Sequence, residues 1–425
     1  MRPRDRETAA PSRADRGLRR QHRAAKTALG KTQASLHTPL PSEPHQEMAA
    51  SNFPVAMGIP IAESTTTDIS YPEHPAAFNR ASTEASLNAL THKGYPIGLV
   101  SALRGSLDAF PLRIWIVDNS GSMASSDGCR FVQKPGTTSY KKVATTRRAE
   151  LGDVVTGIGE LTAALGVRTD FHLLNPPPAA SQFVSLGPSD AAGTSAPPPA
   201  GKSATLDELK RVMATSPTGT TPLDASVQRI CDMVEPTAEK LRAHGQKVVV
   251  VIATDGLPND RTRFISAMQR LQALPVWTVV RLCTDDEGVT EYYSNLDKDL
   301  EAPLEVLDDI CGEAQEVKRL NGFLAYGPPL HQLREWGLHE KLFDTLDEQR
   351  MLPSQVKQFV EFTLGCQPLP DPDADAAAFL KAVGEALKSA PPTFDPLLLR
   401  EAPWFDMGRL RQHVTGGGGG GCAIS

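Results

Sequence analysis

The chain has 425 residues, 40% of them hydrophobic, which is enough for one large core and a smaller one. Its formal net charge is only −6, so composition gives no reason to expect nucleic acid as a partner. The six cysteines are scattered without a CxxC pair, which argues against a zinc site or a disulfide framework and favours reduced thiols in the cytoplasm. No run approaches the ~18 apolar residues of a membrane-spanning helix, and no apolar signal-peptide core follows the start.

Residues 1–90 are rich in Ala, Ser, Thr, Pro and charged side chains and contain few large apolar ones, so we expect them to be disordered. Up to Lys31 this segment holds ten basic residues against three acidic ones. Such a tail can touch anionic lipid, whereas the early Asp5 and Glu7 argue against an organelle presequence. Met48 is an alternative start that would remove the tail.

A polar cluster follows the apolar run 112–117, which has the character of a buried strand. Asp118, Ser120 and Ser122 place a carboxylate and two hydroxyls on every second residue directly behind it. Open α/β sheets bind their ligands above the carboxyl ends of their strands. The pattern therefore indicates a metal site, with an ordinary turn that closes the strand as the alternative.

The segment that follows combines regular elements with two insertions. Residues 141–165 carry a helical apolar stripe, and residues 167–174 have the pattern of a strand. Residues 124–139 form an insertion that would hang over the metal face. Residues 175–202 contain two proline triplets, and because proline fixes φ and removes a donor, we expect an exposed flexible loop there, with a polyproline ligand as the alternative.

Two later loops supply further oxygen atoms. Residues 216–223 present hydroxyls, among them Thr221, on a loop broken by Gly and Pro, just before an expected helix at 224–234. The β-branched run 247–253 is a second candidate buried strand, and Asp255 follows it. Oxygen donors without soft ligands select hard cations, Mg²⁺ above all, with Mn²⁺ or Ca²⁺ as substitutes.

The same alternation continues towards residue 318. Residues 261–274 have a core-facing helical stripe, and residues 275–283 have the pattern of another buried strand. Strands that alternate with helices imply right-handed crossovers and a mostly parallel sheet covered on both faces. We therefore predict an α/β fold, a doubly wound mostly parallel sheet, for a domain at 95–318.

These loops resemble those of the von Willebrand factor type A domain, a Rossmann-like family, with a complete metal-ion-dependent adhesion site. The family's Asp-x-Ser-x-Ser matches Asp118, Ser120 and Ser122. Its loop threonine matches Thr221, and its later aspartate before glycine matches Asp255. The resemblance implies that hydroxyls touch the metal while the aspartates act largely through water. The ion is then short of negative charge, and a partner's Asp or Glu carboxylate completes the coordination.

Beyond this domain the pattern changes to short helices. Residues 319–365 contain three of them, which would cap the sheet or form a small helical appendage. Residues 366–415 read as a linker followed by a helix at 376–387. The acidic residues from Asp344 to Glu348 resemble a calcium loop, but the loop glycine and the twelfth-position Glu are missing, so we reject calcium binding there.

The chain ends in a pattern that fits prenylation. Residues 416–425 combine a glycine leash with Cys422, two aliphatic-type residues and a final serine, which favours a farnesyl group. One lipid chain gives only weak and reversible membrane binding. We therefore expect farnesyl on Cys422 and a peripheral, partner-assisted membrane association; an accidental terminal tetrapeptide is the alternative.

The features favour a binding module over an enzyme. A metal-dependent hydrolase needs a nucleophile or base beside the ion, and none of the three loops contains a histidine. His172 lies on the expected second strand and is interpreted as a core residue. We therefore expect an intracellular adaptor that grips a partner's carboxylate through Mg²⁺. The alternatives are a subunit of a larger ATPase-driven or protein-turnover complex and a metal-dependent hydrolase.

Overall fold

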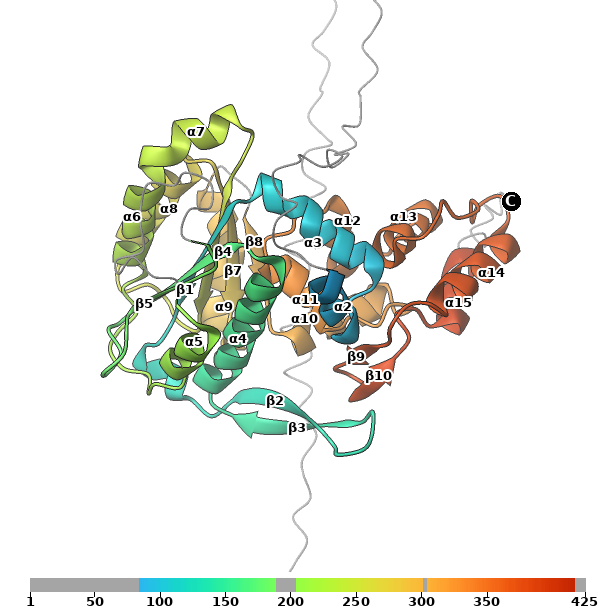
Figure 1. Ribbon diagram of the computed structural model, residues 1–425, viewed down its shortest axis with the longest axis horizontal. Helices are drawn as coiled ribbons and strands as arrows, with labels where there is room; N and C mark the ends of the chain where they lie inside the picture. Colours follow the sequence, from blue (N-terminus) through green and yellow to red (C-terminus); the bar gives the residue numbers. More distant parts are fainter. Residues whose placement is uncertain (1–83, 189–203, 301–303, 417–425) are drawn as a thin grey trace, which may run out of the picture. The chain divides into compact units, whose positions relative to one another are not determined.

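The computed structural model describes residues 84–188, 204–300 and 304–416, and a six-stranded sheet forms its centre (Figure 1). The strand order is β5-β4-β1-β6-β7-β8. All neighbours pair in parallel except β5, which is antiparallel to β4. This order is that of a doubly wound sheet and confirms the predicted α/β fold. The strands are β1 Leu112–Val117, β4 Arg168–Leu173, β5 Phe183–Leu186, β6 Val248–Thr254, β7 Val276–Leu282 and β8 Glu305–Leu307.

The central strands are buried on both faces, which explains why their sequences are mostly apolar, with Arg113 as the charged exception on β1. Because the side-chain period of a strand is two, β1 sends Ile114 and Ile116 to one face and Trp115 and Val117 to the other. The face that carries Ile114 and Ile116 is covered by helices that follow β5 in the chain (Figure 1). They are α6 Leu223–Val234, the short turn η3 Glu235–Thr237, α7 Ala238–Ala243, α8 Arg261–Gln272 and α9 Glu287–Asp299.

The opposite face shares one core with a second group of helices, the last of which lie away from the sheet (Figure 1). Those before or between the strands are α2 Glu84–His92, α3 Ile97–Ala109, α4 Arg147–Leu165 and α5 Leu206–Met213. Those after β8 are α10 Ile310–Leu320, α11 Pro328–Glu335, α12 Lys341–Glu348, α13 Pro353–Leu364, α14 Ala376–Leu387 and α15 Met407–Thr415.

The residues after α11 attach the C-terminal helices directly to the sheet. The Trp336 ring lies 3.9 Å from the guanidinium carbon of Arg113 on β1, and its carbonyl accepts a hydrogen bond from Arg113 Nε at 3.2 Å. A Cβ on Gly337, which has φ +85°, would lie 2.4 Å from Cγ1 of Val249. Residues 336 and 337 therefore pack directly against the sheet.

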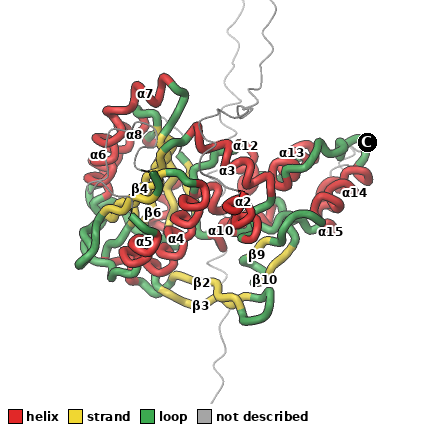
Figure 2. The backbone as a smooth tube through the Cα atoms, in the orientation of Figure 1, coloured by secondary structure: helices red, strands yellow, loops and turns green. Residues whose placement is uncertain are grey.

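A β-hairpin corrects the expected start of the first long helix. β2 Gly128–Gln133 pairs with β3 Tyr140–Thr145, so residues 141–145 are a strand, where we predicted helix. α4 begins only at Arg147, because the Thr146 hydroxyl accepts a hydrogen bond from Ala149 N and caps it. Figure 2 shows the hairpin in yellow, outside the central sheet and near β9 Thr393–Asp395 and β10 Arg400–Ala402.

Two further expectations need correction. β5 lies inside residues 175–202, which we expected to be loop throughout; it occupies a sheet edge, where few backbone donors are needed. Residues 84–90, which we placed in the disordered tail, belong to α2. The remaining expectations for the tail, for residues 189–202 and for Cys422 lie outside the described residues. Among those described, we find no helix long and apolar enough to cross a membrane.

Candidate functional site

Two aspartates flank the point where the strand order reverses. β1 lies between β4 and β6, so the chain winds outward from it in both directions. Asp118 follows β1, Asp255 follows β6, and Asp118 N donates to Ala253 O at 2.9 Å. Such a switch point leaves a crevice outside the carboxyl ends of the two strands, and doubly wound sheets bind ligands there.

The Asp118 carboxylate is fixed by its neighbours. It is fully buried, and burial raises its pKa. Its Oδ1 accepts a hydrogen bond from Ser120 N at 2.7 Å, and its Oδ2 accepts one from the Thr254 hydroxyl at 2.6 Å. Both oxygens therefore already have one donor each, which orients the group and leaves its remaining lone pairs for a ligand or water. Thr254 was not among the predicted site residues.

The serine hydroxyls connect the two aspartates. Ser122 Oγ donates to Asp255 Oδ1 at 2.8 Å and lies 3.0 Å from Ser120 Oγ. Both serines belong to the loop around the short 3-10 helix η1 Gly121–Ala124. Ser120 and Asp255 are 2% and 3% exposed, whereas Ser122 is exposed, so a ligand from solvent would meet Ser122 first.

The loop that carries Thr221 is held in place by hydrogen bonds from the loop after β1 and from Asn175. Gly121 N donates to Gly219 O at 3.1 Å, and the Asn175 side chain donates to Thr220 O at 2.8 Å. Gly219 has φ +84°, and a Cβ there would lie 2.5 Å from Asn175 Oδ1, so glycine is required. Asn175 was not among the predicted site residues.

Within this loop the two adjacent threonines differ. The Thr220 hydroxyl is exposed and accepts a hydrogen bond from Asn259 Nδ2 at 3.0 Å. Thr221 is 9% exposed, and its hydroxyl lies 3.5 Å from where a Cβ on Gly256 would stand, next to Asp255. Thr221 is therefore the threonine whose hydroxyl lies on the side of the second aspartate.

An arginine that the sequence reading missed completes this cluster. Arg147, the first residue of α4, donates from Nη1 to Asp255 Oδ2 at 2.9 Å and from Nε to Asp127 Oδ1 at 2.7 Å. The hydrogen bonds to Asp127 and Asp255 raise the pKa of Arg147, and the same contact lowers the pKa of Asp127. A permanent positive charge, 15% exposed, thus lies beside one of the two carboxylates.

The donor set fits a hard divalent cation better than a soft one. Its atoms are carboxylate and hydroxyl oxygens, the type that Mg²⁺, Mn²⁺ and Ca²⁺ prefer. Across the described ranges, no three His, Cys, Asp or Glu side chains come together as a metal-binding group, so a metal here would depend on the hydroxyls. His172 packs against Phe183 with ring centroids 4.7 Å apart, and burial lowers its pKa to about 4.

Comparisons with known proteins add little to this geometry. Neither a family model nor a curated protein matches the chain. Among solved structures it is similar to the manganese-loaded TRAP protein of Plasmodium vivax, with 16% sequence identity and a TM-score of 0.29 over 49% of this chain and 71% of that one. A superposition at this level carries no argument about function, and the fold rests on the strand order described above.

Proposed function

We propose that the chain is a protein-binding module that depends on a divalent metal, with Mg²⁺ as the resident ion and Mn²⁺ or Ca²⁺ as substitutes. The oxygen atoms that would hold the ion belong to Asp118, Ser120, Ser122, Thr221 and Asp255. The observation that supports this most is the meeting of Asp118 and Asp255 at the switch point, joined by the hydroxyls of Ser120 and Ser122.

The charge of the site favours an acidic partner. The two carboxylates only balance the charge of a divalent ion, and the three hydroxyls add no charge. Arg147 adds a positive charge next to Asp255. A bound ion supplies a Lewis-acid centre that accepts one more oxygen ligand. The exposed side of the cluster, at Ser122, would admit the carboxylate of a partner's Asp or Glu. This arrangement corresponds to the adhesion site of the von Willebrand factor type A resemblance.

The proposed location is the cytoplasm, with a weak membrane association through farnesyl on Cys422. The C-terminal Cys-aliphatic-aliphatic-Ser pattern supports the lipid, and the basic residues before Lys31 supply a second membrane signal. Intact-mass measurement of the protein from a eukaryotic host tests this. A farnesyl adduct that disappears in Cys422→Ser agrees with the proposal, and its absence from the wild type contradicts it.

The same site also suits a subunit of a larger ATPase-driven or protein-turnover complex, because the metal would then hold a neighbouring subunit. The two versions differ in the size of the native particle. A stable peak of megadalton scale in size-exclusion chromatography favours the complex, and reversible partners favour the adaptor. A hydrolase is the third alternative; the described site offers no histidine and no third carboxylate for the chemistry.

The experiment compares partner capture on the immobilised protein in Mg²⁺ and in EDTA. The Asp118→Ala variant removes a central ligand, and Asp232→Ala is a matched control, because Asp232 is an exposed aspartate on α6 whose contact is an ion pair with Arg270. Binding of the same partners by wild type and Asp232→Ala in Mg²⁺, and loss in EDTA and in Asp118→Ala, is expected. An identical set in all four conditions would contradict the proposal.

A further inference from the structure

Two cysteines far apart in the sequence meet beside a lysine at the β2–β3 hairpin. Cys129 lies on β2 and is half-buried, and Cys311 lies in the first turn of α10 and is 8% exposed. Lys142 on β3 donates from Nζ to Cys311 Sγ at 3.8 Å. Both thiols are free in this structure, and a side-chain hydrogen bond links them.

The surroundings shift the pKa values of the two thiols in opposite directions. The hydrogen bond with Cys311 lowers the pKa of Cys129, and the positive charge of Lys142 acts in the same direction. That bond and burial raise the pKa of Cys311. Cys129 is therefore the more acidic of the two thiols and gives the reactive thiolate more readily, whereas Cys311 holds its proton more tightly.

We propose that Cys129 and Cys311 form a redox-sensitive pair that closes to a disulfide when the protein meets a peroxide. The Cys129 thiolate attacks one oxygen of hydrogen peroxide, the O–O bond breaks, and the released hydroxide takes a proton to form water. The resulting sulfenic acid is attacked by the Cys311 sulfur, which loses its proton as the S–O bond breaks and a second water leaves. Two thiols and one peroxide give one disulfide and two waters.

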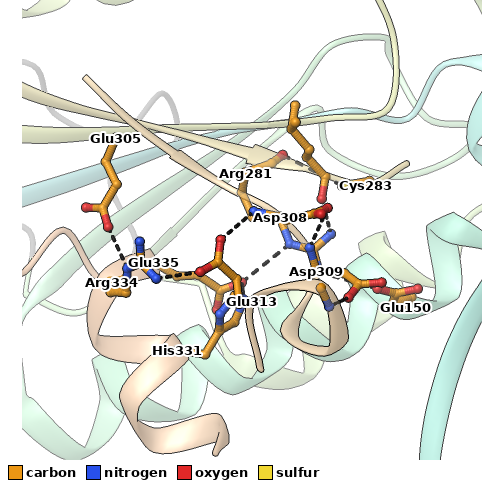
Figure 3. A network of polar contacts seen from close by, with 12 residues as sticks. Glu150, Arg281, Cys283, Glu305, Asp308, Asp309, Glu313, His331, Arg334 and Glu335 are labelled. Carbon is orange, nitrogen blue, oxygen red and sulfur yellow. Dashed lines mark hydrogen bonds and ion pairs between the residues drawn. The ribbon is translucent and has the colours of Figure 1, made fainter. Parts of the chain in front are cut away.

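The bond would connect the hairpin to a buried polar network. Cys129 N donates to Glu150 Oε2 at 2.8 Å, and Glu150 Oε1 lies 3.4 Å from Arg281 Nη2. Arg281 Nε in turn lies 3.4 Å from Glu335 Oε1. Figure 3 shows this network together with Asp309, the N-cap of α10. The hairpin is otherwise held by hydrogen bonds and packing, so a covalent bond to α10 would restrict it.

The other described cysteines differ in ways that make this pair specific. Burial raises the pKa of Cys231 to about 11 and that of Cys283 to about 12. Cys366 is half-buried like Cys129, but burial raises its pKa as well. Cys366 is therefore the matched control, since its accessibility is in the same class and its thiol is less acidic.

The first test needs no variant in the folded core. Wild-type full-length protein is labelled with iodoacetamide for increasing times at pH 7 and analysed by peptide mass spectrometry. Because a lower pKa gives a larger thiolate fraction at pH 7, Cys129 should be alkylated faster than Cys366. Equal rates for the two cysteines would overturn the assignment of the thiolate.

The second test detects the bond itself. Full-length Cys422→Ser protein, which lacks the terminal thiol, is treated with one equivalent of hydrogen peroxide and mapped without reduction. A cross-linked peptide pair containing Cys129 and Cys311 is expected, and reductant should remove it. Cys366→Ser should still form it, and Cys311→Ser should leave Cys129 as a sulfenic acid that dimedone traps. Recovery of Cys129 and Cys311 in separate peptides from the oxidised, folded protein would refute the proposal. Neither test depends on the metal site.

Discussion

Replacing Arg147 by alanine should raise the affinity of the site for Mg²⁺ or Mn²⁺. In the structure, Arg147 Nη1 donates to Asp255 Oδ2 at 2.9 Å, while the other oxygen of Asp255 accepts from Ser122. A divalent ion held by this cluster must compete with the guanidinium for Asp255. The alanine variant removes that competitor and leaves the carboxylate to the ion.

The size of the effect follows from the contact. A hydrogen bond to a charged group contributes about 1.5–3 kcal/mol, and about 1.4 kcal/mol corresponds to a tenfold change in a dissociation constant. Repulsion between the guanidinium and a doubly charged ion acts in the same direction. Arg147 keeps its bonds to Asp127 when it releases Asp255, which offsets part of the gain. We therefore expect Arg147→Ala to bind the metal about tenfold more tightly.

Calorimetric titration of Mn²⁺ into wild type and variants measures this directly. Asp127→Asn provides a change of opposite sign: it weakens the second hold on Arg147, strengthens its pairing with Asp255, and should lower the metal affinity. If Arg147→Ala instead loses metal affinity while circular dichroism shows an intact fold, Arg147 orients Asp255 and does not compete for it, and the reasoning is wrong.

Three other predictions concern stability and the threonine loop. Burial lowers the pKa of His172 to about 4, so the unfolded chain takes up a proton between pH 6.5 and 4 while the folded protein does not, and up to about 3 kcal/mol of stability should be lost over that range. His172→Leu should flatten the pH dependence of urea unfolding there; an unchanged slope would contradict this. Gly219→Ala forces φ +84° and a contact at 2.5 Å with Asn175, so it should cost about 1–2 kcal/mol in urea unfolding and weaken Mn²⁺ binding, whereas unchanged values of both would be inconsistent with the loop geometry. Trp336→Ala removes a fully buried ring from Arg113 and should destabilise the protein by about 3–5 kcal/mol in the same assay; a loss below about 1 kcal/mol would mean that the C-terminal helices do not depend on it.

The sheet could be predicted because its signal is local. Residues 112–117 and 248–253 are mostly apolar without alternation, Arg113 excepted, and strands buried on both faces of an α/β domain have such sequences. The polar residues that follow each run then fall at the same edge, because parallel strands end on the same side. This is why Asp118 and Asp255 could be paired from the sequence, although they are far apart along the chain.

The hairpin could not be predicted in the same way. Val143 lies in the range 141–165 where we predicted a helical stripe, but its side chain is 36% exposed on β3, and the strand exists because β2 pairs with it. Pairing between strands is a non-local contact that periodicity does not contain. The role of Arg147 was missed for the same reason, since it depends on α4 starting there and not several residues earlier.

The C-terminal helices give an intermediate case. The expected helix at 376–387 has the bounds of α14, whereas α15 was not predicted. Their docking on the sheet depends on Trp336 and Gly337, whose contacts with Arg113 and Val249 join segments more than eighty residues apart. A single sequence shows that these helices have an apolar face, but it does not show which surface that face covers.

Diffraction at the manganese absorption edge, from crystals of the full-length protein grown with Mn²⁺, tests the central claim most directly. We expect one anomalous peak between the loops after β1 and β6, with the hydroxyls of Ser120, Ser122 and Thr221 as ligands. Crystals of Asp118→Ala should lack that peak. An ordered wild-type site without manganese, in which Arg147 still pairs with Asp255, would contradict the account.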